Sequence, residues 1–310
     1  MMALKEKILV TVDGSDRSLE TVKHIAKRKP FQKKHLVLFN VFISLPDFYW
    51  DIENEPQSRG AVVKAKACEA SKKNKMEEFM KKAQQILFNS GFPKETVTVK
   101  IQEYEDGIAR DIIKEAHDEY CAVVINRTGA GAISNLLLGS KAVKVIEKLS
   151  LVPVFIEGSK PPGNSILIAM DSSECSMQAI DFSGELMGGL DFNITLLHAI
   201  RGAGALIPRA GNLSLSREDI QAQKDDIHAV FDQARHRLIN FGFKPENITR
   251  KIIADVSSRA KAIVQEAKKN RHTTIVVGRR GLSKVQEFFM GSVSNKVIQL
   301  SEEQAVWVVT

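Results

Sequence analysis

The sequence predicts an α/β protein built from two tandem, doubly wound domains. This prediction depends on an internal repeat and on short apolar runs that alternate with helical patterns. ILVTVDGSDRS, which starts at Ile8, recurs as ILIAMDSSECS, which starts at Ile166, and further segments recur in the same order. At about 150 residues, each repeat is long enough to bury its own core. We expect domains at residues 1–158 and 164–310, joined by the linker EGSKPPGN.

Strands and helices are expected to alternate within each repeat. In the first repeat the apolar runs are ILVTV, VLFNV, TVTVKI, AVVI and PVFI, and apolar residues at helical spacing lie between them, for example over residues 76–87. Nearly continuous apolar runs, such as TIVV in the second repeat, are typical of a parallel sheet covered by helices on both faces. Right-handed crossovers then make an open doubly wound sheet the simplest topology. The first repeat carries seven extra residues, which we place in the loop around LPDFYWDIENEPQ.

The charge distribution does not favour a nucleic-acid partner. The chain has a formal net charge of +7, with 25 basic and 21 acidic residues in 1–158 and 19 and 16 in the remainder. Nucleic-acid binding usually requires a concentrated basic patch. The densest basic stretch, residues 64–82, also carries apolar residues at helical spacing, so its lysines are expected on the solvated face of an amphipathic helix. Such a face is a weak anion-attracting surface.

Cysteine usage and hydropathy indicate a cytoplasmic protein. Cys68, Cys121 and Cys175 are far apart and form no C-x-x-C pair, so we expect reduced structural thiols and no zinc or iron–sulfur site. No apolar run reaches the roughly 18 residues of a membrane span. The amino terminus is expected to form a strand that ends at Asp13 rather than a secretory signal. No membrane partner is expected.

The candidate site lies where strands of the second repeat end, because doubly wound sheets bind ligands beyond the carboxyl ends of their strands. Glycines there allow close backbone approach and positive φ, and a helix start offers amides and a dipole to an anion. Serine hydroxyls and an arginine could assist a phosphate, whereas a carboxylate suits ribose hydroxyls or an adenine amine. The segments are Ala169-Met170-Asp171-Ser172-Ser173, Val277-Gly278-Arg279-Arg280-Gly281 and Gly291-Ser292-Val293-Ser294.

Spacing alone leaves an alternative open, in which the glycines only turn a strand into a helix that Ser292 caps.

Three other sequence features are weaker evidence for a functional site. Gly139-Ser140-Lys141 lacks the spacing of a Walker A motif. His198 ends a strand and is interpreted as a structural histidine rather than a base. Phe48-Tyr49-Trp50 is interpreted as local packing in a long loop, with a cover for a pocket or partner as the alternative.

A family resemblance decides between these interpretations. The spacing G-x-x-G, nine residues, then G-S, occupied by Gly278, Gly281, Gly291 and Ser292, resembles the nucleotide signature of ATP-binding universal stress proteins. ILVTVDGSDRS, the strand LLHAI and the segment PVPVFIEG also resemble that family, and the resemblance covers nearly the whole chain as two copies. It implies a Rossmann-like, five-stranded parallel sheet of order 3-2-1-4-5 in each domain.

The resemblance also implies roles for the candidate residues. Asp171 and the backbone around Ala169 and Ala199 would hold adenine and ribose, and the glycines, Arg280 and the serines of the helix start would hold ribose and phosphates. The candidates in the second domain are Ala169, Met170, Asp171, Ser172, Ala199, Val277, Gly278, Arg280, Gly281, Gly291, Ser292, Val293 and Ser294. The implied ligand is ATP, or AMP or ADP in its place, with Mg²⁺ as its accompanying ion and no metal site on the protein itself.

The first repeat departs from the signature. Asn126 replaces the first glycine, and Lys141 and Ala142 stand where the second repeat has Val293 and Ser294. Asn is the least costly substitute for Gly in a left-handed conformation, so the turn itself need not be lost. The Asn126 side chain can still obstruct the ligand, and Ala142 removes the hydroxyl donor that Ser294 supplies. We therefore expect this repeat to bind nucleotide weakly or not at all. The residues of this weaker site are Asp13, Val41, Asn126, Gly129, Gly139 and Ser140.

The expected function is a nucleotide-binding regulator of the stress response. A slow ATPase or nucleotide hydrolase using the same pocket is one alternative, and a nucleotide-free interaction scaffold is another. No catalytic residue is assigned, since no general base or set of metal-binding carboxylates stands out. The resemblance further implies that the two domains pack as a pseudo-dimer through antiparallel pairing of PVFI with AVWVV, and a homodimer is a further candidate assembly.

Overall fold

A computed structural model describes residues 6–45, 57–117, 119–127, 138–202, 217–281 and 290–310, with the backbone alone for 217–220 and 222–224. Gly129 and the segment Phe48-Tyr49-Trp50 lie outside these residues. The elements of the first repeat are β1 (Lys7–Thr11), α1 (Asp16–Ala26), η1 (Lys29–Lys33), β2 (His35–Phe42), α3 (Arg59–Asn89), η2 (Lys94–Thr96), β3 (Val97–Glu103), α4 (Ile108–Ala116), β4 (Tyr120–Asn126), α5 (Ser140–Lys148) and β5 (Val154–Glu157). Those of the second are β6 (Ser165–Ala169), α6 (Glu174–Met187), β7 (Asn193–Arg201), α7 (Arg217–Asn240), η4 (Pro245–Asn247), β8 (Ile248–Val256), α8 (Arg259–Lys269), β9 (Thr274–Gly278), α9 (Ser292–Leu300) and β10 (Ala305–Val309).

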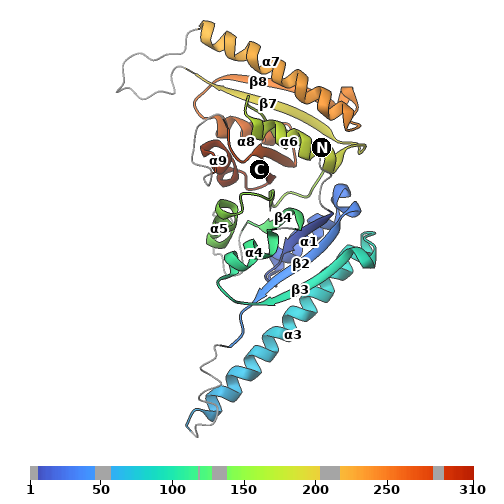
Figure 1. Ribbon diagram of the computed structural model, residues 1–310, viewed down its shortest axis with the longest axis vertical. Coiled ribbons are helices and arrows are strands. Elements are labelled where there is room, and N and C mark those ends of the chain that lie inside the picture. The colour runs from blue at the N-terminus through green and yellow to red at the C-terminus, as the bar shows by residue number, and fades with distance from the viewer. Residues whose placement is uncertain (1–5, 46–56, 118, 128–137, 203–216, 282–289) are drawn as a thin grey trace, which may run out of the picture.

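The strands of the described residues form one ten-stranded sheet of order β3-β2-β1-β4-β5-β10-β9-β6-β7-β8 (Figure 1). Within each repeat the order is 3-2-1-4-5 and the pairing is parallel, so the predicted doubly wound fold is confirmed. The two sheets are not separate, because β5 and β10 pair antiparallel, with Trp307 opposite Phe155. One continuous sheet therefore carries both repeats.

Helices cover the sheet on both faces, and each face has a core that continues across the two repeats. On one face α1, α3, α6 and α7 enclose a cluster that includes Phe155 and Trp307. On the other face α4, α5, α8 and α9 enclose a cluster that includes Ile156 and Val306. Alternate residues of β5 and β10 thus enter opposite cores, as the two-residue period of a strand requires.

The repeat in sequence is reproduced in local structure. Ser15 caps α1 by accepting a hydrogen bond from the amide of Ser18, and Ser173 caps α6 from Ser176 in the same way. Helix α3 begins at Arg59, well before the apolar spacing predicts, because the alanine- and lysine-rich residues 59–75 favour a helix without an apolar stripe. Figure 1 shows this part of α3 extending beyond the sheet.

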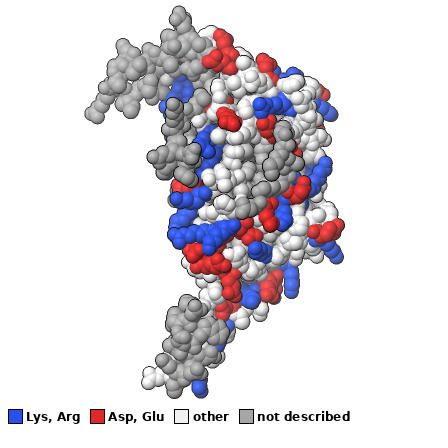
Figure 2. All heavy atoms as spheres, in the orientation of Figure 1, with Lys and Arg blue, Asp and Glu red and all other residues white. Residues whose placement is uncertain are grey.

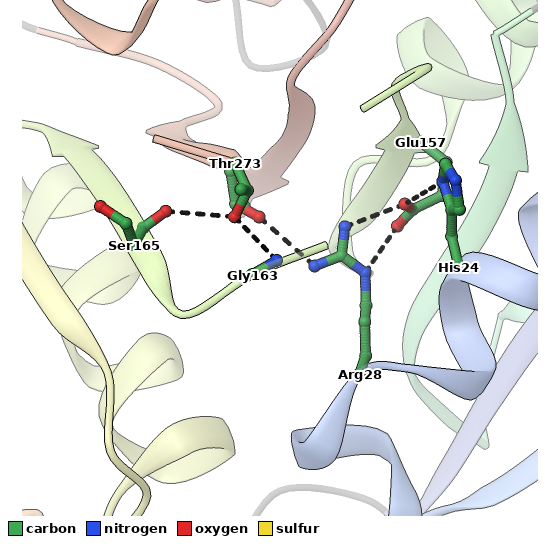
Figure 3. Close-up of polar contacts among 7 residues, drawn as sticks. His24, Arg28, Glu157, Gly163, Ser165 and Thr273 are labelled. Carbon is green, nitrogen blue, oxygen red and sulfur yellow. Dashed lines mark hydrogen bonds and ion pairs between the residues drawn. The ribbon is translucent and has the colours of Figure 1, made fainter. Parts of the chain in front are cut away.

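A buried polar cluster joins the repeats beside the β5–β10 pair (Figure 3). Nε and Nη2 of Arg28 donate to the two carboxylate oxygens of Glu157 at 3.0 and 2.9 Å, and Nη1 donates to Oγ1 of Thr274 at 3.3 Å. The guanidinium also lies 5.4 Å from the centre of the Trp307 ring, which stacks on Phe155 at 4.3 Å. Arg28 of the first repeat thus contacts β9 and β10 of the second repeat, through Thr274 and Trp307.

Two buried arginines form a reciprocal link between the repeats. Arg279, which follows β9, donates to the carbonyl oxygens of Ile146, Glu147 and Leu149 at the end of α5. Arg127, which follows β4, donates to carbonyl oxygens at the end of the corresponding helix α9, to that of Ile298 at 2.7 Å and to that of Ser301. Each arginine caps the last helix of the other repeat, where unpaired carbonyls otherwise remain.

The described surface is mixed in charge. Figure 2 shows Lys and Arg interspersed with Asp and Glu over the face it displays. Of the helices in the described parts of the chain, none combines the length and the apolar character that a span requires. The lysines of α3 are exposed or half-buried, as predicted for its solvated face.

Candidate functional site

The candidate residues of the second repeat meet at the carboxyl edge of the sheet. Ala169, the last residue of β6, lies beside Val277 of β9, and the chain leaves these neighbouring strands toward opposite sides of the sheet. This is the switch point where doubly wound sheets bind ligands. Met170, Ala199 and Val277 are buried, whereas Ser172 is exposed.

Asp171 is held in a fixed orientation at this edge. Its Oδ1 accepts hydrogen bonds from the amide of Ser173, at 3.0 Å, and from the Ser173 hydroxyl. Its Oδ2 faces Gly281, where an added Cβ would come within 2.5 Å of that oxygen. The carboxylate therefore lies against the glycine of the neighbouring loop, with no room for a side chain there.

The motif glycines are needed for close approach and not for a left-handed backbone. None of Gly278, Gly281 and Gly291 has a positive φ, so that part of the sequence interpretation is wrong. A Cβ at Gly278 would come within 2.9 Å of the Cys175 backbone, which means that this glycine lets α6 pack on β9. Asn126 is the last residue of β4, in extended conformation, so its presumed tolerance as a left-handed residue does not apply either.

Helix α9 starts without a side-chain cap. Gly291 is its N-cap and no side chain bonds to its first amides, so Ser292 does not cap the helix as the alternative interpretation required. The Ser294 hydroxyl donates to the Gly278 carbonyl at 2.7 Å, which ties α9 to β9 and places Ser294 as a positioning residue rather than a free donor. Arg280 and Val293 are half-buried beside this start. The uncapped turn can accept an anion.

His198 is a structural residue with a counterpart in the first repeat. Its Nδ1 donates to the Met170 carbonyl at 2.7 Å, and Nδ2 of Asn40 donates to the corresponding carbonyl of Val12 at 2.8 Å. Burial lowers the pKa of His198 below its ordinary value of 6.5, and the hydrogen bond to Met170 only partly opposes that shift. The histidine links β7 to the end of β6, so it holds the backbone that leads into Asp171.

The lowered pKa predicts a dependence of stability on pH. Below about pH 6.5 the imidazole of His198 binds a proton in the unfolded chain but not in the folded chain. The free energy of unfolding therefore falls as the pH falls toward the folded-state pKa. Burial also lowers the pKa of His24 and His272, which adds to the same slope. His198→Asn, which copies Asn40, should make urea-denaturation stability less steep between about pH 6.5 and 5. An unchanged slope, or the same change in a control at the exposed His228, contradicts this assignment.

The first repeat contains a cavity of about 830 Å³ at the equivalent place. Every described residue of the predicted weaker site lines it, namely Asp13, Val41, Asn126, Gly139 and Ser140. Helix α5 starts at Ser140 with Gly139 as an N-cap that lacks a side-chain bond, as α9 does in the second repeat. The sequence-predicted residues are thus brought together here as well.

Sequence reasoning missed several residues that shape these sites. Lys72 and Lys75 of α3 line the first-repeat cavity, although the sequence suggested only a solvated face. Asn40 lies under the same cavity, and the signal for it was its alignment with His198 in the repeat. Arg127 and Arg279 also occupy matching positions in the two repeats, which could have marked them as structural.

Among the described residues, no group of three or more His, Cys, Asp or Glu could hold a metal ion.

Comparison with known proteins identifies the family. The model of the universal stress protein family matches residues 5–156 and again 164–310. The universal stress protein YxiE of Bacillus subtilis (strain 168) is 28% identical over 143 residues, which cover 44% of this chain and 93% of that protein. A universal stress protein from Archaeoglobus fulgidus DSM 4304 has the same fold over 98% of both chains (TM-score 0.63, 18% identity), and one described as putative from Pseudomonas aeruginosa UCBPP-PA14 covers 98% of this chain and 92% of its own (TM-score 0.54, 16% identity). The chain belongs to the universal stress protein family, in a tandem form with two copies of the family fold.

Proposed function

We propose that this protein binds an adenine nucleotide, ATP first among them, in the second repeat and acts as a stress-response regulator without rapid chemistry. One observation carries the proposal: the fixed carboxylate of Asp171, the bare backbone of Gly281 and the uncapped start of α9 meet at the switch point of the sheet. An added Cβ at Gly291 would lie 3.3 Å from the Arg279 carbonyl and 3.7 Å from the Gly281 amide, which puts the helix start beside the glycine loop.

Each part of this arrangement matches one part of a nucleotide. Asp171 can accept hydrogen bonds from the ribose hydroxyls, and the two bonds from Ser173 hold it ready to do so. The first amides of α9 and its dipole favour the phosphates, with Arg280 beside them. The buried Met170, Ala199 and Val277 offer an apolar surface to adenine. Mg²⁺ would accompany the phosphates, as it does for nucleotides elsewhere.

Binding and regulation are favoured over hydrolysis because Asp171 is already engaged as an acceptor beside the sugar position. A phosphoryl-transfer site needs a group that orients the attacking water in line with the phosphate. The two fused repeats act as a pseudo-dimer through β5 and β10. A regulator of this kind would signal by having its nucleotide bound or absent.

The decisive experiment measures bound nucleotide and turnover in the full chain. The purified protein is denatured, the released small molecules are identified, and ATP turnover is then followed. Released ATP, ADP or AMP with negligible turnover supports the proposal. Rapid hydrolysis identifies an enzyme instead. No released nucleotide together with no affinity for added ATP leaves a nucleotide-free scaffold and overturns the proposal.

Gly281→Ala should weaken adenine-nucleotide binding at this site by about 10- to 100-fold, the effect of disturbing a charged hydrogen bond. The new Cβ would press on Oδ2 of Asp171, whose other oxygen is held by Ser173. Calorimetric titration with ATP measures the change. Gly60→Ala is the matched control, because nothing lies within 4 Å of its added Cβ on the exposed start of α3. Equal affinities for the two variants would rule out the role given to Asp171 and Gly281.

A further inference from the structure

The polar cluster of Figure 3 lies at one end of the β5–β10 pair. Because these strands are antiparallel, their last residues, Glu157 and Val309, lie at opposite ends of the pair. Glu157 binds Arg28, whose Nη1 reaches Oγ1 of Thr274 in the second repeat at 3.3 Å, and Nδ1 of His24 lies 4.0 Å from the same carboxylate. The strand registers and helix caps that the repeats share give the matching residues as Val309 for Glu157, Leu186 for Arg28, Phe182 for His24 and Ala122 for Thr274.

The two ends of the junction differ in polarity at each of these positions. One set is buried and polar or charged, and comprises His24, Arg28, Glu157 and Thr274; the other is buried and apolar, and comprises Phe182, Leu186, Val309 and Ala122. The centre of the junction is alike in both repeats, since Phe155 faces Trp307 and the caps made by Arg127 and Arg279 are reciprocal. The apolar set shows that the fold needs no charge at these positions, so the polar set requires another explanation.

We propose that this difference makes the junction an interaction surface that selects its partner. The β5 edge of a first repeat pairs with the β10 edge of a second repeat, and it disfavours the β5 edge of another first repeat. The partner that it fits offers a buried hydroxyl where Thr274 stands and an indole where Trp307 stands. This inference concerns the assembly of the repeats and is independent of the nucleotide site.

A pair of two first repeats would leave the buried guanidinium of Arg28 without its partners. A second copy of Ala122 would take the place of Thr274, and a second copy of Phe155 would take that of Trp307. Nη1 would then have no acceptor across the junction, and the guanidinium would face a weaker aromatic partner than an indole. An unpaired buried donor destabilises a structure more than its hydrogen bond stabilises it.

A pair of two second repeats would carry the complementary defect. Each fully buried Thr274 hydroxyl would face the apolar side chain of Leu186 and lose the guanidinium that donates to it. Only the pairing of unlike repeats brings Arg28 and Thr274 together and leaves Leu186 with Ala122. Arg127 and Arg279 bond backbone carbonyls, so their caps can form in any of the three pairings and do not distinguish among them.

The coupling between Arg28 and Thr274 can be measured in the full chain by urea denaturation. Thr274→Ala should raise the equilibrium constant of unfolding by about 10-fold, because a buried donor loses its acceptor. With Arg28→Leu/Glu157→Val already present, which installs the second-repeat residues, the same change should have an effect of less than about 2-fold. Thr98→Ala, at an exposed position of β3, is the control and should act equally in both backgrounds. Equal effects of Thr274→Ala in the two backgrounds would overturn the proposal.

The opposite end of the junction gives a test that depends on a change of sign. Ala122→Thr alone should destabilise the chain, because the new hydroxyl is buried beside apolar residues. In a Leu186→Arg/Val309→Glu background the same change should stabilise the chain, because it supplies the acceptor that the new arginine lacks. Destabilisation in both backgrounds would contradict the proposal. If the background variant does not fold, the Thr274 comparison decides.

Partner selection itself can be read from refolding at increasing protein concentration, with the share of dimers measured by light scattering. Repeats joined by a short linker meet at an effective concentration of about 1 mM, so a chain without preference should place roughly a tenth of its molecules in intermolecular pairs at about 0.1 mM. We expect this of Arg28→Leu/Glu157→Val/Thr274→Ala, and about 10-fold fewer such dimers of the native chain and of the exposed-pair control Glu20→Gln/Lys23→Gln. Equal shares in the native chain and the triple variant would show that the cluster selects no partner.

Discussion

Glu157→Gln is expected to lower the free energy of unfolding by about 3–5 kcal/mol, the usual cost of removing one partner from a buried ion pair. Glu157 is 4% exposed and Arg28 is 5% exposed. The guanidinium of Arg28 bonds both carboxylate oxygens at about the same distance, 3.0 and 2.9 Å, so an amide can accept only part of this interaction and leaves the charge unbalanced. The loss should be large because the pair lies where the two repeats join.

Urea denaturation followed by circular dichroism measures this loss. Glu20→Gln is the control, since Glu20 pairs with Lys23 at 2.6 Å but its side chain is 59% exposed, and such pairs contribute at most about 1 kcal/mol. Replacing both buried partners, as Arg28→Met/Glu157→Leu, should recover much of the stability, because the unpaired charge is then absent. If the single and control substitutions cost the same, the pair does not stabilise the junction.

Arg279→Met is expected to cost about 3 kcal/mol or more, because the carbonyls of the buried Ile146 and Leu149 lose their donor and each unsatisfied buried acceptor costs about 1–3 kcal/mol. The carbonyl of the exposed Glu147 loses its bond as well. The guanidinium nitrogens lie 2.7–3.0 Å from the carbonyl oxygens of Ile146, Glu147 and Leu149. Arg279 is fully buried, so water cannot replace these bonds without opening the contact between the repeats. Arg279→Lys keeps the charge but not the planar fork, and should rescue only part of the loss.

The same denaturation experiment separates this role from that of an ordinary surface arginine. Arg237 pairs with Asp181 at 2.6 Å with 44% of its side chain exposed, so Arg237→Met should cost at most about 1 kcal/mol. Arg127→Met, at the matching position of the first repeat, should resemble Arg279→Met. A loss at Arg279 no greater than the one at Arg237 would show that the reciprocal caps do not hold the repeats together.

The fold could be predicted from the sequence because the repeat and the apolar runs are local signals. Strands such as TIVV are apolar along their whole length, which is a property of doubly covered parallel sheets and can be recognised without knowing the neighbours. The strand order and the antiparallel pairing of β5 with β10 came from the family resemblance, since periodicity does not specify which strands are neighbours. The full extent of α3 was missed because its first part has no apolar stripe to mark it.

The position of the candidate residues at one edge of the sheet could be predicted from the sequence, but their local contacts could not. The sequence spacing predicted that Asp171, Gly281 and Gly291 lie at the carboxyl edge of the sheet, because the topology of a doubly wound fold fixes where strands end and helices start. It could not tell a glycine needed for positive φ from one needed for close approach, and it could not show that the Ser294 hydroxyl bonds the Gly278 carbonyl. Lys72 and Lys75 reach their cavity from a helix far away in the sequence, so no local pattern points to them.

The joining of β5 to β10 within one chain has an evolutionary consequence. When two identical subunits associate, every mutation appears in both sites, and neither can change its ligand alone. Here the same pairing is encoded by two halves of one gene, so a substitution such as Asn126 or Lys75 alters one pocket and leaves the other intact. Covalent fusion therefore lets the two halves specialise separately while the shared sheet keeps them in a fixed one-to-one ratio.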